Sequence, residues 1–193
     1  FLLSMQGMMT HYIRTVPMHW INRLQAYYER RVFSQTRHAT VDTFWGIETM
    51  REWMPNADIR EVVCAVQAPY LNEEWNPDPA RPAALFVGSI DMPKGVSHRI
   101  GAFHDTRLRK AELWIAGNAT GRLAEQLKSA AGGNVRWLGS LETHQLASQM
   151  AKAWSLVLPT RADTCPTVVK EARAIGLPVV TTPCGGQRDL ITH

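Results

Sequence analysis

The chain has 193 residues, of which 45% are hydrophobic and 20% charged, an ordinary composition for a globular protein with room for one domain and part of another. Its net charge of +4 is a mild basic excess, which suits phosphate-bearing ligands without selecting among them. Three scattered cysteines argue against a disulfide framework or a structural zinc site, and no apolar run reaches the roughly 18–20 residues that span a bilayer.

The first 70 residues are predicted to mix strands and helices. The opening run FLLSM is typical of a buried strand, and residues 19–33 carry aromatic and aliphatic side chains at helical spacing. A strand over 38–44, a short helix over 46–54 and a strand over 60–66 follow. Because the chain begins inside an apolar run, we interpret it as a stretch of a longer protein.

The composition changes at residues 71–82, LNEEWNPDPARP, which hold three prolines and several acids. Such a stretch is typical of a linker between domains. After it, short apolar runs alternate regularly with helical patterns. This alternation predicts an α/β fold in which a parallel, doubly wound sheet has helices on both faces. The predicted strands are 83–88, 112–117, 134–139, 155–159 and 177–182, and the predicted helices are 94–103, 120–130, 142–153 and 166–176.

Open parallel sheets bind ligands at the carboxyl ends of their strands, so the loops after the predicted strands are the candidate site. In the first of them, Lys94 and Gly95 open a helix after Gly88. A lysine beside the free N–H groups of a helix N-terminus suits a diphosphate. The alternative is a solvated loop lysine next to a turn glycine.

The loop and helix over 159–176 hold the densest set of unusual residues. Thr164 and Thr167 can cap the helix or leave its free N–H groups to a ligand, and Pro166 suits the first helical turn. Glu171 lies at the border of the apolar face, where a carboxylate needs a hydrogen-bond donor. That donor is either a pair of sugar hydroxyls or a nearby arginine or backbone amide.

Two further patterns are weaker. The paired glycines Gly185 and Gly186 permit the backbone to approach a ligand or the next loop closely. Asp163 and Glu171 lie on one loop–helix corner, which argues against a glycosidase pair, since a hydrolase places its carboxylates on opposite sides of the scissile bond. The seven histidines show no metal-binding spacing, and we expect no metal site.

The segments FVG…KG, IAG, WLG and LPTRADTCPTVVKEARAIGLPVVTTPCGG, over residues 83–191, together resemble retaining glycosyltransferases of family 4, which have the two-domain GT-B fold. The resemblance implies that residues 1–70 are the C-terminal part of an acceptor-binding domain. Residues 71–82 are then the interdomain linker, and 83–193 form most of a donor-binding domain.

The resemblance also implies roles for single residues. Glu171 matches the second glutamate of the family's E-x7-E signature, expected on the donor ribose, and Asp163 stands where the first glutamate usually lies. Lys94 matches the lysine that holds the diphosphate, so catalysis is assigned to Asp163, Lys94 and Glu171. Ser89 stands where relatives usually carry an arginine on the diphosphate. The implied donor-binding residues are Gly88, Ser89, Lys94, Gly117, Gly139, Leu141, Asp163, Thr164, Cys165, Pro166, Thr167, Val168 and Glu171.

By the same resemblance, the protein moves a hexose-type sugar from a UDP- or GDP-sugar to a glycan or lipid-linked acceptor, with retention and without a metal or other cofactor. We expect it in the cytoplasm, with the inner face of the membrane as a candidate location and no nucleic-acid partner. The basic, aromatic helix 19–33 either touches anionic membrane or packs with a solvated arginine edge. We expect this stretch by itself to be inactive in transfer.

Three alternatives stay open at this point. Ser89 and Asp163 favour a degenerate, non-catalytic nucleotide-sugar-binding or scaffolding relative. A Rossmann oxidoreductase is disfavoured because no GxGxxG follows the first predicted strand of the regular half. A sugar-nucleotide epimerase with the same fold is disfavoured by the corner DTCPTVVKEA, on resemblance alone.

Overall fold

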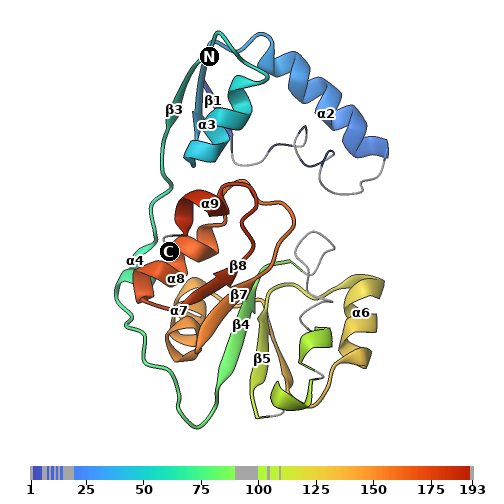
Figure 1. Ribbon diagram of the computed structural model, residues 1–193, viewed down its shortest axis with the longest axis vertical. Coiled ribbons are helices and arrows are strands. Elements are labelled where there is room, and N and C mark those ends of the chain that lie inside the picture. Colours follow the sequence, from blue (N-terminus) through green and yellow to red (C-terminus); the bar gives the residue numbers. More distant parts are fainter. Residues whose placement is uncertain are drawn as a thin grey trace. The chain divides into compact units, whose positions relative to one another are not determined.

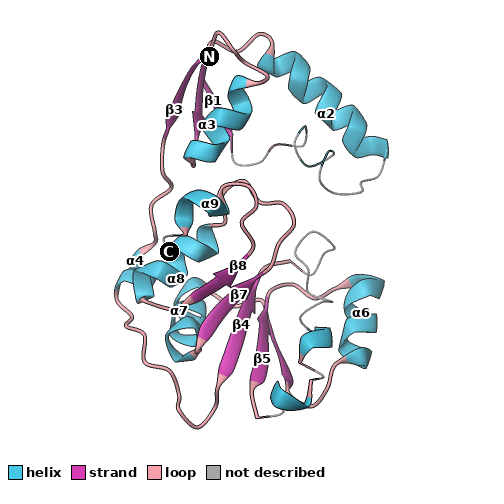
Figure 2. Cartoon of the chain, in the orientation of Figure 1, coloured by secondary structure: helices cyan, strands magenta, loops and turns pink. Residues whose placement is uncertain are grey.

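The computed structural model describes residues 2–5, 8, 10, 12, 14, 20–89, 100–103, 105–108 and 110–191 (Figures 1 and 2). The chain divides into two compact units, which are described separately. Unit 1 consists of Phe1–Ala65, Arg161–Pro166 and Pro183–His193, and unit 2 of Val66–Thr160 and Thr167–Thr182. Among the described helices, none has the length and apolar character needed to cross a bilayer.

Unit 1 contains a three-stranded parallel sheet in the order β1-β2-β3. Strand β2 lies in the centre and pairs with β1 on one side and with β3 on the other. The helix that follows β2 begins after Thr43, whose hydroxyl accepts a hydrogen bond from the Gly46 amide at 3.1 Å, an N-cap that fixes where α3 starts. The elements are β1 (Leu2–Met5), α2 (Trp20–Phe33), β2 (His38–Val41), α3 (Phe44–Arg51), β3 (Asp58–Glu61) and α9 (Gln187–Leu190).

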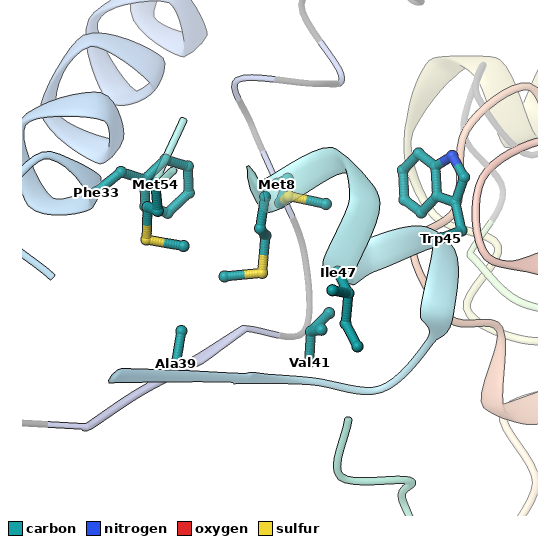
Figure 3. Close-up of a cluster of buried hydrophobic side chains, with 8 residues drawn as sticks. Met8, Phe33, Ala39, Val41, Trp45, Ile47 and Met54 are labelled. Carbon is teal, nitrogen blue, oxygen red and sulfur yellow. The ribbon is translucent and has the colours of Figure 1, made fainter. Parts of the chain in front are cut away.

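The core of unit 1 is a cluster of buried side chains between β2, α2 and α3 (Figure 3). Phe33 comes from the end of α2, and Ala39 and Val41 come from alternate positions of β2, as expected for a strand with one buried face. The cluster comprises Met8, Phe33, Ala39, Val41, Trp45, Ile47, Met50 and Met54.

Unit 2 contains a five-stranded, wholly parallel sheet in the order β6-β5-β4-β7-β8, which the sequence predicted as a doubly wound sheet. Its central strands are buried apolar runs, with Leu85, Phe86, Leu113 and Leu156 fully inaccessible. The elements are α4 (Ala68–Leu71), β4 (Ala83–Val87), η2 (Thr106–Leu108), β5 (Glu112–Ala116), α6 (Gly121–Ala130), β6 (Val135–Gly139), α7 (Thr143–Lys152), β7 (Ser155–Leu158), α8 (Thr167–Ile175) and β8 (Val179–Thr181).

The strand order reverses at β4. From β4 the chain proceeds to β5 and β6 on one side, and then returns to β7 and β8 on the other (Figure 1). Because such parallel crossovers are right-handed, the helices on the two sides of β4 cover opposite faces of the sheet. The carboxyl ends of β4 and β7 therefore flank a topological switch point, the place where open α/β sheets bind ligands.

The proline-rich stretch 71–82 is hydrogen-bonded to the helix ends of unit 2. The Trp75 amide donates to the Ile175 carbonyl at 2.9 Å, and the Trp75 indole N–H donates to the Ala153 carbonyl at 2.9 Å. The Asn76 amide donates to the Ala151 carbonyl at 2.9 Å. These donors satisfy carbonyls that helices α7 and α8 leave free at their C-termini.

Helix α8 ends where the sequence predicts. Gly176 has φ +86°, its amide donates to the Arg173 carbonyl at 3.1 Å, and the Leu177 amide donates to the Ala172 carbonyl at 2.9 Å. This is a Schellman cap, in which glycine takes the left-handed position at no steric cost.

Several predicted boundaries need correction. The strand predicted over 38–44 ends at Val41, because the Thr43 cap begins a helix there. The strand predicted over 60–66 is β3, Asp58–Glu61, and the next residues, Val62 and Val63, are 55% and 59% exposed. β3 is an edge strand of this sheet, and its pairing with β2 ends at Glu61. Of the predicted helix 94–103, residues 94–99 lie outside the described residues.

Candidate functional site

Three glycines gather at the carboxyl ends of neighbouring strands in unit 2. Gly88, Gly117 and Gly139 follow or end β4, β5 and β6, and their φ angles are +147°, +140° and +69°. The Gly88 amide donates to the Ala116 carbonyl at 3.0 Å, and the Gly117 amide donates to the Gly139 carbonyl at 2.8 Å. A Cβ at Gly117 would lie 2.0 Å from the Gly88 carbonyl oxygen. Glycine is therefore required at Gly117, and these turns bring backbone to the ligand-binding edge of the sheet.

Glu171 lies on α8 in the same unit, and it is half-buried. Helix α4 packs against α8, and Tyr70 of α4, which is 3% exposed, lies close enough to the Glu171 carboxyl to affect its pKa. Burial raises the pKa of the Glu171 carboxyl above its usual value, and the neighbouring Tyr70 hydroxyl opposes that rise. The sequence indicated that this carboxylate needs a hydrogen-bond donor, either sugar hydroxyls or a nearby arginine or backbone amide. In the structure, the side chain that lowers its pKa is Tyr70.

The loop 161–166 belongs to unit 1, where two contacts hold its backbone. The Thr43 hydroxyl donates to the Thr164 carbonyl at 3.2 Å, and the Gly186 amide donates to the Asp163 carbonyl at 3.1 Å. The chain after this loop is tied to the same place, because Asp189 accepts a hydrogen bond from the Trp45 amide at 2.7 Å, near the start of α3. Asp163 and Thr164 are buried, at 9% and 3% exposure.

The paired glycines Gly185 and Gly186 serve this loop. A Cβ on Gly185 would lie 1.9 Å from the Asp163 carbonyl oxygen, and one on Gly186 would lie 1.9 Å from that of Thr164. Of the two uses that the sequence allowed for this pair, close approach to the next loop is the one that the structure shows. The position of the Asp163 backbone thus depends on glycines that follow the last strand.

The other predicted donor-binding residues are distributed between the units. Cys165 and Pro166 belong to unit 1, and Thr167 and Val168 open α8 in unit 2. Ser89 follows β4, and Leu141 lies between β6 and α7. Unit 2 therefore brings together the strand-end glycines, and unit 1 holds the Asp163 loop. Lys94 lies outside the described residues.

One cation in α8 escaped the sequence analysis. Lys170 is 9% exposed, and its Nζ atom has no hydrogen-bond partner among the described residues. A buried ammonium without a partner is costly, so this position is suited to an anion. No sequence pattern indicated a role for Lys170, because a lysine at a helical position is usually solvated.

Tyr70 and Thr43 were also missed. Tyr70 stands beside the predicted linker, at the end of a run without clear periodicity, and Thr43 was assigned to a strand. A proline two residues into a helix, as Pro69 is, could have indicated the short helix α4 that carries Tyr70. Within the described ranges, His, Cys, Asp and Glu side chains form no group of three that could hold a metal ion.

Residues 81–193 match the family described as "Glycosyl transferases group 1". The chain therefore belongs to the glycosyl transferases group 1 family. It is 30% identical over 175 residues to a protein of Mycobacterium tuberculosis (strain CDC 1551 / Oshkosh) named GDP-mannose-dependent alpha-mannosyltransferase. That match covers 90% of this chain and 44% of the relative, so the chain spans less than half of the relative's length.

Two solved structures have the same fold. Sucrose-phosphate synthase from Thermosynechococcus elongatus superposes with a TM-score of 0.77 at 20% identity, over 97% of this chain and 51% of that one. WaaG, a glycosyltransferase involved in lipopolysaccharide biosynthesis, superposes with a TM-score of 0.77 at 21% identity, over 96% of this chain and 57% of that one. The fold is GT-B, as the sequence predicted.

Proposed function

We propose that the protein to which this chain belongs transfers a hexose-type sugar from a UDP- or GDP-sugar to a glycan or lipid-linked acceptor, as a retaining enzyme of family 4. The observation that carries the proposal is the half-buried Glu171 on α8, the helix that follows β7 at the switch point of the sheet. The membership in group 1 supports it, and the mannosyltransferase relative favours GDP as the nucleotide.

The leaving group in such a transfer is a nucleoside diphosphate. When the bond between the anomeric carbon and the β-phosphate oxygen breaks, negative charge develops on that oxygen, and the acceptor hydroxyl attacks from the same face. We assign the stabilisation of this charge to Lys94 and to the free N–H groups at the start of α8. Asp163 is assigned to the transferred sugar and Glu171 to the ribose. No step of this assignment requires a divalent metal.

A turnover assay tests the proposal. The parent protein is incubated with a panel of UDP- and GDP-sugars and candidate acceptors in the presence of EDTA, and nucleoside diphosphate release is measured. We expect release from donors of one base, undiminished by EDTA, and a product whose anomeric configuration by NMR is that of the donor. Product of the opposite configuration would reject retention, and full inhibition by EDTA would reject metal independence.

The alternative is a degenerate relative that binds nucleotide sugars without turning them over. Ser89 favours this alternative, because a hydroxyl replaces a cationic side chain on the diphosphate. The same assay separates the two, since a binding protein shows nucleotide affinity without release of nucleoside diphosphate.

We also propose that helix α2 contacts an anionic membrane surface. Opposite its buried residues, Ala26 and Phe33, the helix exposes a row of large apolar side chains, with the exposed Arg23 and Arg31 on the same helix. The row comprises Trp20, Ile21, Leu24, Tyr27, Tyr28 and Val32, each between 41% and 65% exposed. An apolar face with cations suits the headgroup region of anionic lipids.

Vesicle co-sedimentation of the parent protein tests this contact. We expect binding to vesicles rich in phosphatidylglycerol, weakened about 10- to 30-fold by the double change Arg23→Gln and Arg31→Gln, because each cation near an anionic surface contributes about 1 kcal/mol. Arg60→Gln is the matched control, since Arg60 is exposed on β3. Equal binding by the double variant and the control would contradict the proposal.

A further inference from the structure

The start of helix α3 is bound to two segments that come from far along the chain. The Thr43 hydroxyl donates to the Thr164 carbonyl at 3.2 Å, in the loop that precedes α8. The Trp45 amide donates to the Asp189 carboxylate at 2.7 Å, on α9. All four residues belong to unit 1, so both contacts lie within one compact body. The proposed reaction leaves both contacts without a role.

The Thr43 hydroxyl makes two hydrogen bonds. Its oxygen accepts from the Gly46 amide at 3.1 Å, which caps α3, and its O–H donates to the Thr164 carbonyl. A hydroxyl can do both at once, because it has one donor and two acceptor positions. Thr43 is 1% exposed, and a Cβ on Gly186 would lie 2.7 Å from its methyl carbon. The residue that caps α3 therefore also holds the backbone beside Asp163.

A second attachment reaches Asp163 through α9. The Trp45 amide is one of the N–H groups that a helix leaves without an intrahelical partner in its first turn, and the Asp189 carboxylate satisfies it. A carboxylate at that end of α3 also complements the helix dipole. Three residues before Asp189, the Gly186 amide donates to the Asp163 carbonyl at 3.1 Å. The start of α3 is thus connected to the Asp163 loop by two separate routes.

We propose that Thr43 and Asp189 are positioning residues for the sugar-transfer step, because they hold the backbone that presents Asp163 to the transferred sugar. The inference rests on the proposed function, which assigns Asp163 to that sugar. A displacement of about 1 Å at the reacting groups can slow a reaction about 100-fold, even when its cause lies far from the chemistry. The ribose is assigned to Glu171, which belongs to unit 2. We therefore expect the loss of either contact to lower the transfer rate much more than the nucleotide affinity.

Steady-state turnover of the parent protein tests Thr43, with the donor that the wild type uses fastest among a panel of UDP- and GDP-sugars. Thr43→Val keeps the shape of the side chain and removes the hydroxyl. We expect it to lower kcat about 10- to 100-fold, while the calorimetric dissociation constant of the corresponding nucleoside diphosphate changes less than about twofold. Thr43→Ser can make both hydrogen bonds again, and we expect it to retain most of the wild-type kcat.

Thr36→Val is the matched control for the removal of a buried hydroxyl. Thr36 also belongs to unit 1 and is 8% exposed, and its hydroxyl donates to the Val32 carbonyl at 2.8 Å. Because this hydrogen bond lies within the turn that ends α2 and involves no residue of the Asp163 loop, we expect Thr36→Val to keep the wild-type kcat.

Asp189→Ala is a second variant that does not depend on replacing a buried residue, since Asp189 is exposed. We expect the same lowered kcat with little change in nucleotide affinity. Its control is Asp78→Ala, which removes a carboxylate that accepts the Ala80 backbone N–H at 2.9 Å in unit 2. If Thr43→Val fails to fold, Asp189→Ala decides alone.

The outcomes separate this inference from the proposed function. A wild-type kcat in Asp189→Ala or in a folded Thr43→Val would overturn the inference alone. An equal fall of kcat in the two control variants would also overturn it, since the effect would then be one on stability. A folded wild type that releases no nucleoside diphosphate from any donor would overturn the proposed function and this inference with it.

Discussion

Replacing Gly117 with alanine is expected to destabilise unit 2 by about 4 kcal/mol. The new Cβ would lie 2.0 Å from the Gly88 carbonyl oxygen, which is backbone and cannot rotate away, and the φ of +140° is a conformation that L side chains rarely adopt. Overpacking typically costs about 1–3 kcal/mol, and an unfavourable backbone conformation costs about as much again. Because a domain is stable by about 5–15 kcal/mol, the loss is a large share of the total.

Thermal unfolding of the purified variant followed by circular dichroism measures this effect, and we expect Tm to fall by about 10–20 °C. Gly133→Ala is the matched control. Gly133 also lies in a loop of unit 2, no atom lies within 4 Å of its added Cβ, and its φ is not positive. We expect Gly133→Ala to unfold at the wild-type temperature or slightly above it. If both variants unfolded together with the wild type, the close approach of β4 and β5 at this edge would be wrong.

The regular half of the fold could be predicted because its local signals agree. Strands β4 to β8 are short and largely apolar, and glycine or proline follows most of them, so the pattern and the turn chemistry indicate the same boundaries to within one or two residues. The order β6-β5-β4-β7-β8 could not be read from single segments, because it depends on pairing between strands far apart along the chain. The sequence analysis predicted a doubly wound parallel sheet without its strand order.

The elements that the sequence did not predict correctly also have physical explanations. Helices α4 and α9 have four residues each, too few for a helical period to appear. Val62 and Val63 have the β-branched side chains typical of strands, yet they are exposed and lie past the end of β3, since strand propensity depends on a neighbouring strand to pair with.

The sequence indicated which residues belong to the candidate site, but it indicated fewer of the contacts that these residues make. Glu171 was identified because a carboxylate beside an apolar helix face needs a donor, but Tyr70, the neighbour that lowers its pKa, comes from a distant segment with no recognisable motif. Asp163 and Glu171 are adjacent on a loop and helix in the sequence. The structure attaches the backbone of Asp163 to Gly186 in unit 1, while Glu171 belongs to unit 2.

Replacing Glu171 with alanine is expected to weaken nucleotide binding about 100-fold. The carboxylate is proposed to accept hydrogen bonds from the ribose, and a hydrogen bond to a charged group contributes about 1.5–3 kcal/mol. Hydrogen bonds from the ligand favour the ionised carboxylate, so affinity falls as the pH is lowered through the pKa of Glu171. Because burial raises that pKa, the loss begins at a higher pH than for an ordinary glutamate. In Glu171→Gln this pH dependence disappears.

Calorimetric titration of the parent protein with GDP, UDP and their sugars, in EDTA, is the decisive test of a nucleotide site that includes Glu171. Glu171→Ala is titrated beside the wild type, with Glu125→Ala as the control, since Glu125 is exposed on α6. We expect nucleotides of one base to bind to the wild type and to Glu125→Ala with the same affinity, and about 100-fold more weakly to Glu171→Ala. Equal affinity in all three proteins, or no binding by a folded wild type, would contradict this expectation.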